Sequence, residues 1–168
     1  YQEGDNRGGY VRFIDNQCLQ TMNTALLRGR YFNNSDRIGS EPVVIISQSL
    51  AKNAWKGEDP LGKTALVNDG SEYKVIGIVA DVAHGLDGNT PPDFYLSFEQ
   101  WERAHWSSPN LVFRTASSHQ SSLTDVRTAI QQYDANLPTN DFIHLTDIVD
   151  RAIAPRRFMM GTLIAFSV

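Results

Sequence analysis

Apolar and polar residues follow two different periods along the chain, and these periods predict an alternation of strands and helices. Residues 42–46 are wholly apolar, which predicts a strand that is covered on both faces. Residues 47–55 place Leu50, Ala51 and Trp55 on one helical face behind Ser47, a favourable N-cap residue. The same criteria predict strands at residues 10–14, 64–67, 72–82, 93–97, 110–115 and 141–145, and helices that begin at Asp15, Ser122 and Thr146.

The order of these elements predicts the fold class. Asp69 and Gly70 lie between two runs of β-forming residues, which is a strong hairpin signal. We therefore expect residues 64–67 to pair antiparallel with the strand that ends near Asp81. Residues 110–145 are expected to form a strand, a helix and a strand, a βαβ unit with a right-handed crossover. Together these units predict an α+β fold with a mixed sheet.

Residues 57–64 match the phosphate-binding pattern G-x-x-x-x-G-K-[ST], and the apolar run closing on Asp81 resembles the second acidic motif of nucleotide hydrolases. A phosphate loop follows a strand and opens a helix, so that its N–H groups point at the phosphates. Here the predicted order is helix, loop, strand. Glu58 and Asp59 place carboxylates where phosphates would lie, and Pro60 removes one N–H donor. The context favours a turn between a helix and a strand.

Other candidate sites are weaker. Gly29 between Arg28 and Arg30 is compatible with an anion site, although a solvated turn leading into a strand is favoured. His84 lies near Asp81 and Asp87, a sparse metal-ligand pattern for which a surface loop is the preferred interpretation. The sequence contains no nucleophile elbow and no Cys/His metal spacing. We therefore assign no catalytic, cofactor-binding or metal-binding residue and expect no cofactor.

Composition narrows the class of protein and of partner. Of the 168 residues, 41% are hydrophobic and 20% are charged, as in a globular domain, and the net charge is −4. Lysine and arginine do not cluster with aromatic residues, which argues against a nucleic-acid partner. The one cysteine, Cys18, shares an apolar helical face with Leu19 and Met22, so we expect it in the core. Trp101 and Trp106 lie in a segment, 98–109, for which local packing is favoured over a partner or membrane role.

The chain ends in 11 residues without a charge, 158–168. A membrane span needs roughly 20 apolar residues. We expect the run to be the truncated beginning of a span and the sequence to be a fragment of a longer protein.

Seven stretches in order resemble one family. They are residues 10–22, the run Leu26-Leu27-Arg28-Gly29-Arg30-x-Phe32, residues 42–51, the run from Trp55 through Gly57-Glu58-Asp59-Pro60-Leu61-Gly62-Lys63, residues 73–82, residues 91–96, and Ala154-Pro155-Arg156-Arg157-Phe158. This series resembles the MacB-type periplasmic core domain of ABC transporter permeases, in the FtsX-like permease superfamily. It is most similar to the duplicated orphan permeases of soil bacteria.

The resemblance implies a two-lobed domain outside the bacterial inner membrane, between the first and second transmembrane helices. Residues 1–107 would form the inserted lobe and hairpin region, 108–154 the βαβ half of a porter-like lobe, and 155–168 the start of a transmembrane helix. It also implies a non-enzymatic part of a dimeric or pseudo-dimeric export machine. Its partners would be its own transmembrane helices, a cytoplasmic ATPase subunit or domain, and a periplasmic adaptor protein.

The sequence therefore leaves three hypotheses for the function. The leading hypothesis is a non-catalytic domain that transmits conformational change or contacts substrate or partner during export. The second is a periplasmic ligand-binding or adaptor module with its own pocket. The third, a nucleotide hydrolase, rests on residues 57–64 alone.

Overall fold

A computed structural model describes residues 9–67, 70–84, 90–101, 110–114 and 120–134. The chain divides into two compact units, Tyr1–Phe113 and Arg114–Val168. The lobe boundaries expected after residues 107 and 154 stay a prediction. Among the described residues, no helix has the length and apolar character needed to cross a membrane.

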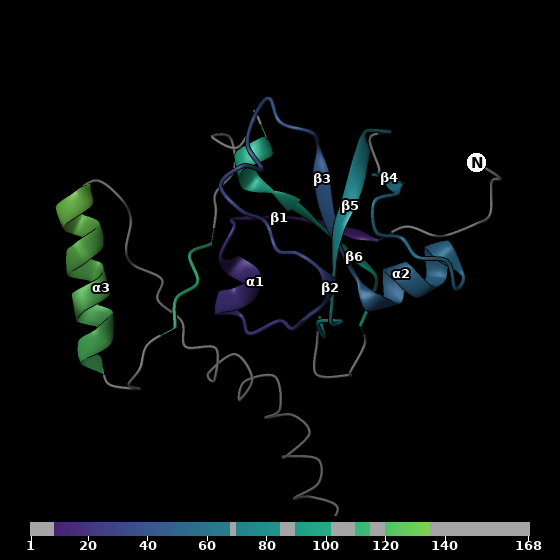
Figure 1. The fold of residues 1–168 in the computed structure, drawn as a ribbon. Coiled ribbons are helices and arrows are strands. Elements are labelled where there is room, and N and C mark those ends of the chain that lie inside the picture. The colour runs from purple at the N-terminus through teal and green to yellow at the C-terminus, as the bar shows by residue number, and fades with distance from the viewer. Residues whose placement is uncertain (1–8, 68–69, 85–89, 102–109, 115–119, 135–168) are drawn as a thin grey trace, which may run out of the picture. The chain divides into compact units, whose positions relative to one another are not determined.

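The first unit is built on a six-stranded sheet with the order β1-β6-β3-β5-β2, in which β4 pairs with β5 beside this path (Figure 1). Two neighbouring pairs, β1 with β6 and β3 with β5, are parallel, and the other pairs are antiparallel. The predicted mixed sheet is therefore confirmed. Its strands are β1 Tyr10–Ile14, β2 Leu26–Gly29, β3 Val43–Ser47, β4 Thr64–Leu66, β5 Glu72–Val79 and β6 Asp93–Ser97.

Strand β3 lies at the centre of the sheet, and all five of its residues are buried. Because side chains alternate along a strand, Val44 and Ile46 face one core cluster while Val43 and Ile45 face another. The first cluster includes Leu50 of helix α2 (Gln48–Trp55), and the second includes Leu19 of helix α1 (Cys18–Thr21). The expectation of a strand covered on both faces is confirmed for residues 43–46, whereas Pro42 is exposed and precedes the strand.

A βαβ unit is present at residues 43–79, whereas the unit predicted at residues 110–145 lies partly outside the described residues. Strand β3 leads through α2 and the short strand β4 into β5, which is parallel to β3. Ser47 caps α2 as expected, since its side chain accepts a hydrogen bond from the N–H of Leu50. Strands β4 and β5 form the predicted antiparallel hairpin, with Thr64 opposite Lys74.

The predicted strand at residues 110–115 is wrong over the part that the structure describes. Residues 110–114 have no regular secondary structure, and Leu111 is 69% exposed. The apolar alternation was present, but no described strand offers these residues a ladder of hydrogen bonds. The strand at 141–145, the helix after Thr146 and the apolar tail lie outside the described residues.

Two helices differ from their predicted extents. Helix α1 has four residues rather than a span up to residue 23, because Asn23 adopts a left-handed conformation with φ of 58°. Asp15 does not cap it directly but accepts a hydrogen bond from the N–H of Gln17 at 2.9 Å. In the second unit, helix α3 (Gln120–Tyr133) is found, and Ser122 lies within its first turn rather than at its cap.

Candidate functional site

The 57–64 loop connects the end of α2 to the start of β4, which confirms the turn between a helix and a strand. Lys56 ends α2 in a left-handed conformation, with φ of 40°, and Gly57 follows with φ of 98°. The N–H groups of the loop donate to the protein itself: Glu58 to Trp55 O, Leu61 to Asp59 Oδ1, Gly62 to Val75 O and Lys63 to Pro60 O. These amides are therefore not available to a phosphate group.

The side chains of the loop are also paired within the protein. The ammonium group of Lys63 donates to the carboxylate of Glu58. Arg28 donates through Nη2 to Asp59 Oδ2 at 2.6 Å. These bonds hold the pKa of Glu58 and of Asp59 below their usual values. The basic groups that would attract a phosphate are therefore bound to carboxylates of the loop itself.

Asp81, the second element of the nucleotide hypothesis, acts as a helix cap. Its Oδ1 atom accepts a hydrogen bond from the backbone N–H of Ser49 at 2.7 Å, in the first turn of α2. Carboxylates at helix N-termini satisfy free N–H groups and interact favourably with the helix dipole. The aspartate that follows the apolar strand β5 therefore has a structural explanation here.

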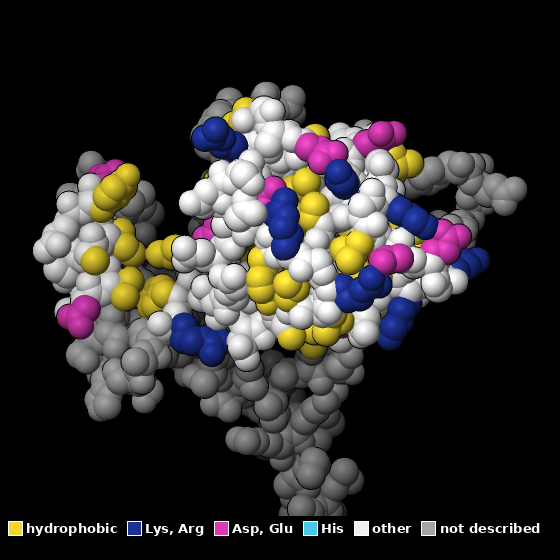
Figure 2. All heavy atoms as spheres, viewed as in Figure 1, with side chains coloured by type: hydrophobic (Ala, Val, Ile, Leu, Met, Phe, Trp, Pro, Cys, Tyr) yellow, Lys and Arg dark blue, Asp and Glu magenta, His cyan; other side chains and the backbone are white. Residues whose placement is uncertain are grey.

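The two arginines around Gly29 do not form an open anion site. Arg30 binds Asp36 through both terminal nitrogens, at 2.6 and 2.8 Å, and Asp36 also accepts from the N–H of Asn33. Arg28 is bound to Asp59. Gly29 is the last residue of β2 rather than a turn before a strand, so the turn interpretation is wrong. On the face in Figure 2, basic and acidic side chains are interspersed.

The most deeply buried charged group that the structure describes is Asp93, at the start of β6, and the sequence analysis did not identify it. Its side chain is fully buried and accepts from Arg12 Nε at 3.0 Å. His84 Nε2 lies 2.7 Å from its other oxygen, and the hydroxyl of Tyr95 lies 3.3 Å away. We call Arg12, His84, Asp93 and Tyr95 the Asp93 cluster.

His84 lies between Asp93 and Arg12 in this cluster. Nη2 of Arg12 lies 2.9 Å from Nε2 and 3.3 Å from Nδ1 of His84, and which ring nitrogen donates and which accepts depends on the tautomer. Burial, followed by the negative charge of Asp93, raises the pKa of the Tyr95 hydroxyl, which therefore stays protonated as a donor.

The Asp93 cluster joins elements that are distant in the sequence. Arg12 belongs to β1, Asp93 and Tyr95 to β6, and His84 to the segment after β5. The backbone N–H of Asp93 also donates to Ser47 Oγ at 2.9 Å, at the end of β3. A charged residue at the first position of a wholly buried strand was the sequence signal that could have indicated this cluster.

The predicted metal trio is not assembled by its described members. His84 contacts Asp93 and Arg12, whereas Asp81 contacts Ser49. Asp87 lies outside the described residues. Within the described part of the chain, no group of three metal-ligating side chains is present.

The remaining candidates, Cys18 and Trp101, are involved in local packing. Cys18 is half-buried rather than in the core, and burial together with the nearby Asp15 carboxylate raises the pKa of its thiol. Trp101 stacks on Phe13 with a centroid distance of 4.2 Å. The other aromatic of that segment, Trp106, is outside the described residues.

Solved structures share this fold. The periplasmic region of MacB from Actinobacillus actinomycetemcomitans gives a TM-score of 0.60 at 19% identity, over 86% of this chain and 64% of that one. The extracellular domain of the ABC-type transporter YknZ from Gram-positive bacteria gives 0.55 at 19% identity, over 74% and 64%. At these identities the comparison shows a common fold.

Sequence comparison agrees with the shared fold. The macrolide export ATP-binding/permease protein MacB of Aggregatibacter actinomycetemcomitans is 33% identical over 78 residues, which are 46% of this chain and 12% of that protein. The matched part of the chain thus spans about an eighth of the length of this curated relative. Residues 1–133 match the MacB-like periplasmic core domain, and the chain belongs to this family.

Proposed function

We propose that this domain lies on the periplasmic side of the bacterial inner membrane, catalyses no reaction, and transmits conformational change or contacts substrate during export. The observation that carries the proposal is the way the strands of the sheet are joined to one another and to α2. Strand β3 is buried on both faces, Asp81 ties the end of β5 to α2, and Asp93 ties β6 to β1. Close-packed cores transmit displacement rather than absorb it.

In this proposal, ATP is hydrolysed on a cytoplasmic ATPase subunit or domain, and the transmembrane helices of the same permease carry the motion to this domain. The 57–64 loop supports the placement of ATP hydrolysis on another subunit or domain, since backbone N–H groups of the loop and the ammonium group of Lys63 form hydrogen bonds within this domain. A homodimer or pseudo-dimer of permeases and a periplasmic adaptor protein complete the proposed assembly.

The location is tested by cysteine labelling in the full-length protein. Lys52 on α2 and Glu72 on β5 are both exposed, so cysteine can replace either with little effect on packing. In a background without other cysteines, a membrane-impermeant maleimide should label both positions in intact spheroplasts. Labelling only after lysis would contradict the proposed location.

Transmission is tested with the same two positions. We expect the maleimide labelling rate of at least one cysteine to change when the permease is trapped with a non-hydrolysable ATP analogue. A variant of the ATPase that cannot bind nucleotide is the control, and it should abolish the change. If the labelling rate at each position were the same in all nucleotide states, the domain would not transmit motion. The ligand-binding or adaptor module would then be the better explanation.

The second function, a periplasmic ligand-binding or adaptor module, is favoured by a specific feature. A hollow of about 650 Å³ opens at the end of the sheet where β1 and β6 finish. Volumes of roughly 300–1,000 Å³ are typical of small-molecule sites.

A further inference from the structure

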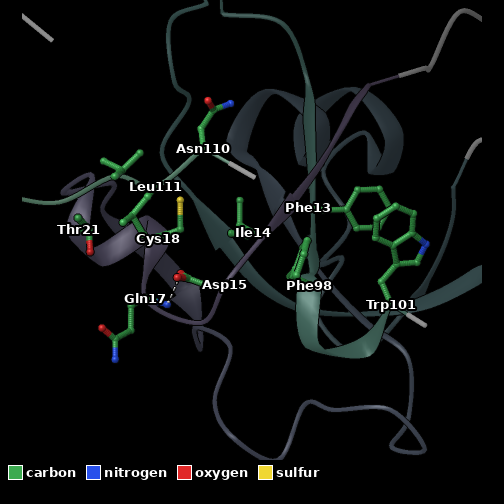
Figure 3. A pocket seen from close by; sticks show the side chains of 11 residues that line it. Phe13, Ile14, Asp15, Gln17, Cys18, Thr21, Phe98, Trp101, Asn110 and Leu111 are labelled. Atoms are coloured by element: carbon green, nitrogen blue, oxygen red, sulfur yellow. Dashed lines mark hydrogen bonds between the residues drawn. The ribbon is translucent and has the colours of Figure 1, made fainter. Parts of the chain in front are cut away.

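The hollow lies on the opposite end of the sheet from Asp93, beyond the last residues of β1 and β6. Figure 3 shows the rings of Phe13 and Trp101 at one side of it and Leu111 at the other, with Ile14, Asp15 and Cys18 between them. All of these residues belong to the first unit of the chain. The hollow is therefore formed by one compact body.

Aromatic and aliphatic side chains form most of its described wall. Phe13 and Trp101 are stacked with an interplanar angle of 19°, and Phe98 meets Trp101 edge-on at 6.4 Å. Phe13 remains 38% exposed and Leu111 69% exposed, so apolar surface is available to a ligand. Apolar burial would therefore supply much of the binding free energy.

The charge of the wall is negative. Asp15 is the one charged side chain among the described residues that line the hollow, and none of those residues is a lysine, arginine or histidine. Its Oδ1 atom accepts from the N–H of Gln17 at 2.9 Å, which fixes the carboxylate at the wall. The same charge contributes to the raised pKa of the Cys18 thiol, so its potential extends into the hollow.

We propose that this hollow binds a small amphiphilic cation, a compact apolar molecule that carries a single positive charge. Its volume accommodates such a molecule, its aromatic rings attract cations, and Asp15 supplies the opposite charge. An apolar segment of protein would instead cover Asp15 and leave its carboxylate without a counter-charge, which is unfavourable. An organic anion of the same size would be repelled.

This inference names the ligand class for the second function and does not depend on the proposed transmission of motion. Ligand binding can be measured on the chain whether or not the domain transmits motion.

The test uses two ions of nearly the same shape and opposite charge, tetraphenylphosphonium and tetraphenylborate, titrated into the 168-residue chain. Calorimetry measures affinity, and the reaction of Cys18 with N-ethylmaleimide reports the site, since the chain has a single cysteine. We expect the phosphonium ion to bind about fivefold more tightly than the borate and to slow the modification of Cys18.

Matched variants separate charge from apolar contact. Asp15→Asn keeps an oxygen that can accept from Gln17 but removes the charge, and should weaken phosphonium binding about fivefold without weakening borate binding. Glu72→Gln makes the same change of net charge on β5, outside the hollow, and should leave both affinities unchanged. Phe13→Leu removes an aromatic face and should weaken the phosphonium ion more than the borate.

Three results would overturn the proposal. Equal affinity for the two ions, or no effect of Asp15→Asn, would show an unspecific apolar surface. Failure of both ions to bind, with Cys18 unreactive in the free protein, would show that another part of the protein or a second copy fills the hollow.

Discussion

The carboxylate of Asp81, two residues beyond the end of β5, accepts a hydrogen bond from the N–H of Ser49 at the start of α2. The two residues are separated by 32 positions in the sequence, yet their bond of 2.7 Å closes the βαβ unit. The segment after β5 thereby adds a second cap interaction to the helix that Ser47 begins.

Loss of this cap should destabilise the first unit. Asp81→Ala removes the acceptor and should lower the free energy of unfolding by about 1 kcal/mol. Asp81→Asn retains an oxygen acceptor and should cost less, since it loses only the interaction of the charge with the helix dipole. Urea denaturation measures both. A larger effect for Asn than for Ala would contradict a capping role.

This bond illustrates what the sequence could and could not predict. Strand β3, helix α2 and the β4–β5 hairpin follow from local patterns, since burial on two faces, a Ser N-cap and an Asp-Gly turn act over a few residues. The partner of Asp81 depends on how β5 lies beside β3, and that register is not encoded locally. From the sequence alone, Asp81 at the close of an apolar run suggested a nucleotide-binding site.

The missed Asp93 cluster and the wrong strand at 110–115 have a related cause. Arg12 and Asp93 are 81 positions apart and meet only because β1 and β6 are parallel neighbours. Leu111 and Val112 lie in a run whose side chains alternate as they do along a strand. A strand also needs a neighbouring strand with which its backbone can form hydrogen bonds. In both cases the structure depends on pairing between segments that are distant in the sequence.

Removal of Arg12 should expose the cost of burying Asp93. Arg12→Ala leaves the fully buried carboxylate with His84, Tyr95 and a backbone environment but without a guanidinium donor. Because Arg12 itself is 45% exposed, we expect a loss of about 1–3 kcal/mol in the free energy of unfolding.

The control for this variant is Lys74→Ala, which removes a surface bond to Glu41. Exposed ion pairs contribute about 0–1 kcal/mol, so the change should be smaller. Chemical denaturation at neutral pH compares the two variants. Equal effects would show that the Asp93 cluster behaves as an ordinary surface pair.

Gly29 and Gly77 face each other where β2 approaches β5. A Cβ atom at Gly29 would lie 2.2 Å from the carbonyl oxygen of Ile76, and Gly29 has φ of 79°. Gly39 has a similar φ of 87° but open space around it. The pair therefore separates backbone strain from steric exclusion.

We expect Gly39→Ala to cost about 1 kcal/mol, the typical cost of a left-handed alanine. Gly29→Ala should cost roughly 3 kcal/mol or more, because the strand must also move away from β5. Thermal and urea unfolding give both values. Similar losses for the two variants would mean that β2 shifts without cost.

Stability should fall in acid in part through Asp36. Hydrogen bonds from Arg30 hold the pKa of this buried carboxyl below its ordinary value of 3.8. A carboxyl with a lowered pKa stabilises the folded state above its unfolded pKa, and this contribution is lost as the pH falls from about 4 through the folded pKa. Asp36→Asn should therefore cost about 1–3 kcal/mol at pH 7 and reduce the loss of stability below pH 4.

Asp59 is the matched control, since its pKa is also lowered by an arginine but its side chain is half exposed. Salt screens exposed pairs more strongly than buried ones. The effect of Asp59→Asn should therefore shrink in 1 M NaCl, while that of Asp36→Asn should persist. An unchanged acid profile in Asp36→Asn would contradict the assignment.

We expect that Lys63 binds no nucleotide, although it occupies the lysine position of a phosphate-binding pattern. Its backbone N–H donates to Pro60, its ammonium group to Glu58, and the loop follows a helix instead of preceding one. Calorimetry of the chain with Mg-ATP should show no binding, and Lys63→Ala should change the free energy of unfolding by no more than about 0.5 kcal/mol. Glu58→Gln, which weakens the same surface pair, should behave alike. Micromolar ATP binding that is lost in Lys63→Ala but kept in Glu58→Gln would show that the loop releases its lysine to a phosphate, and the division of labour proposed for the permease would then be wrong.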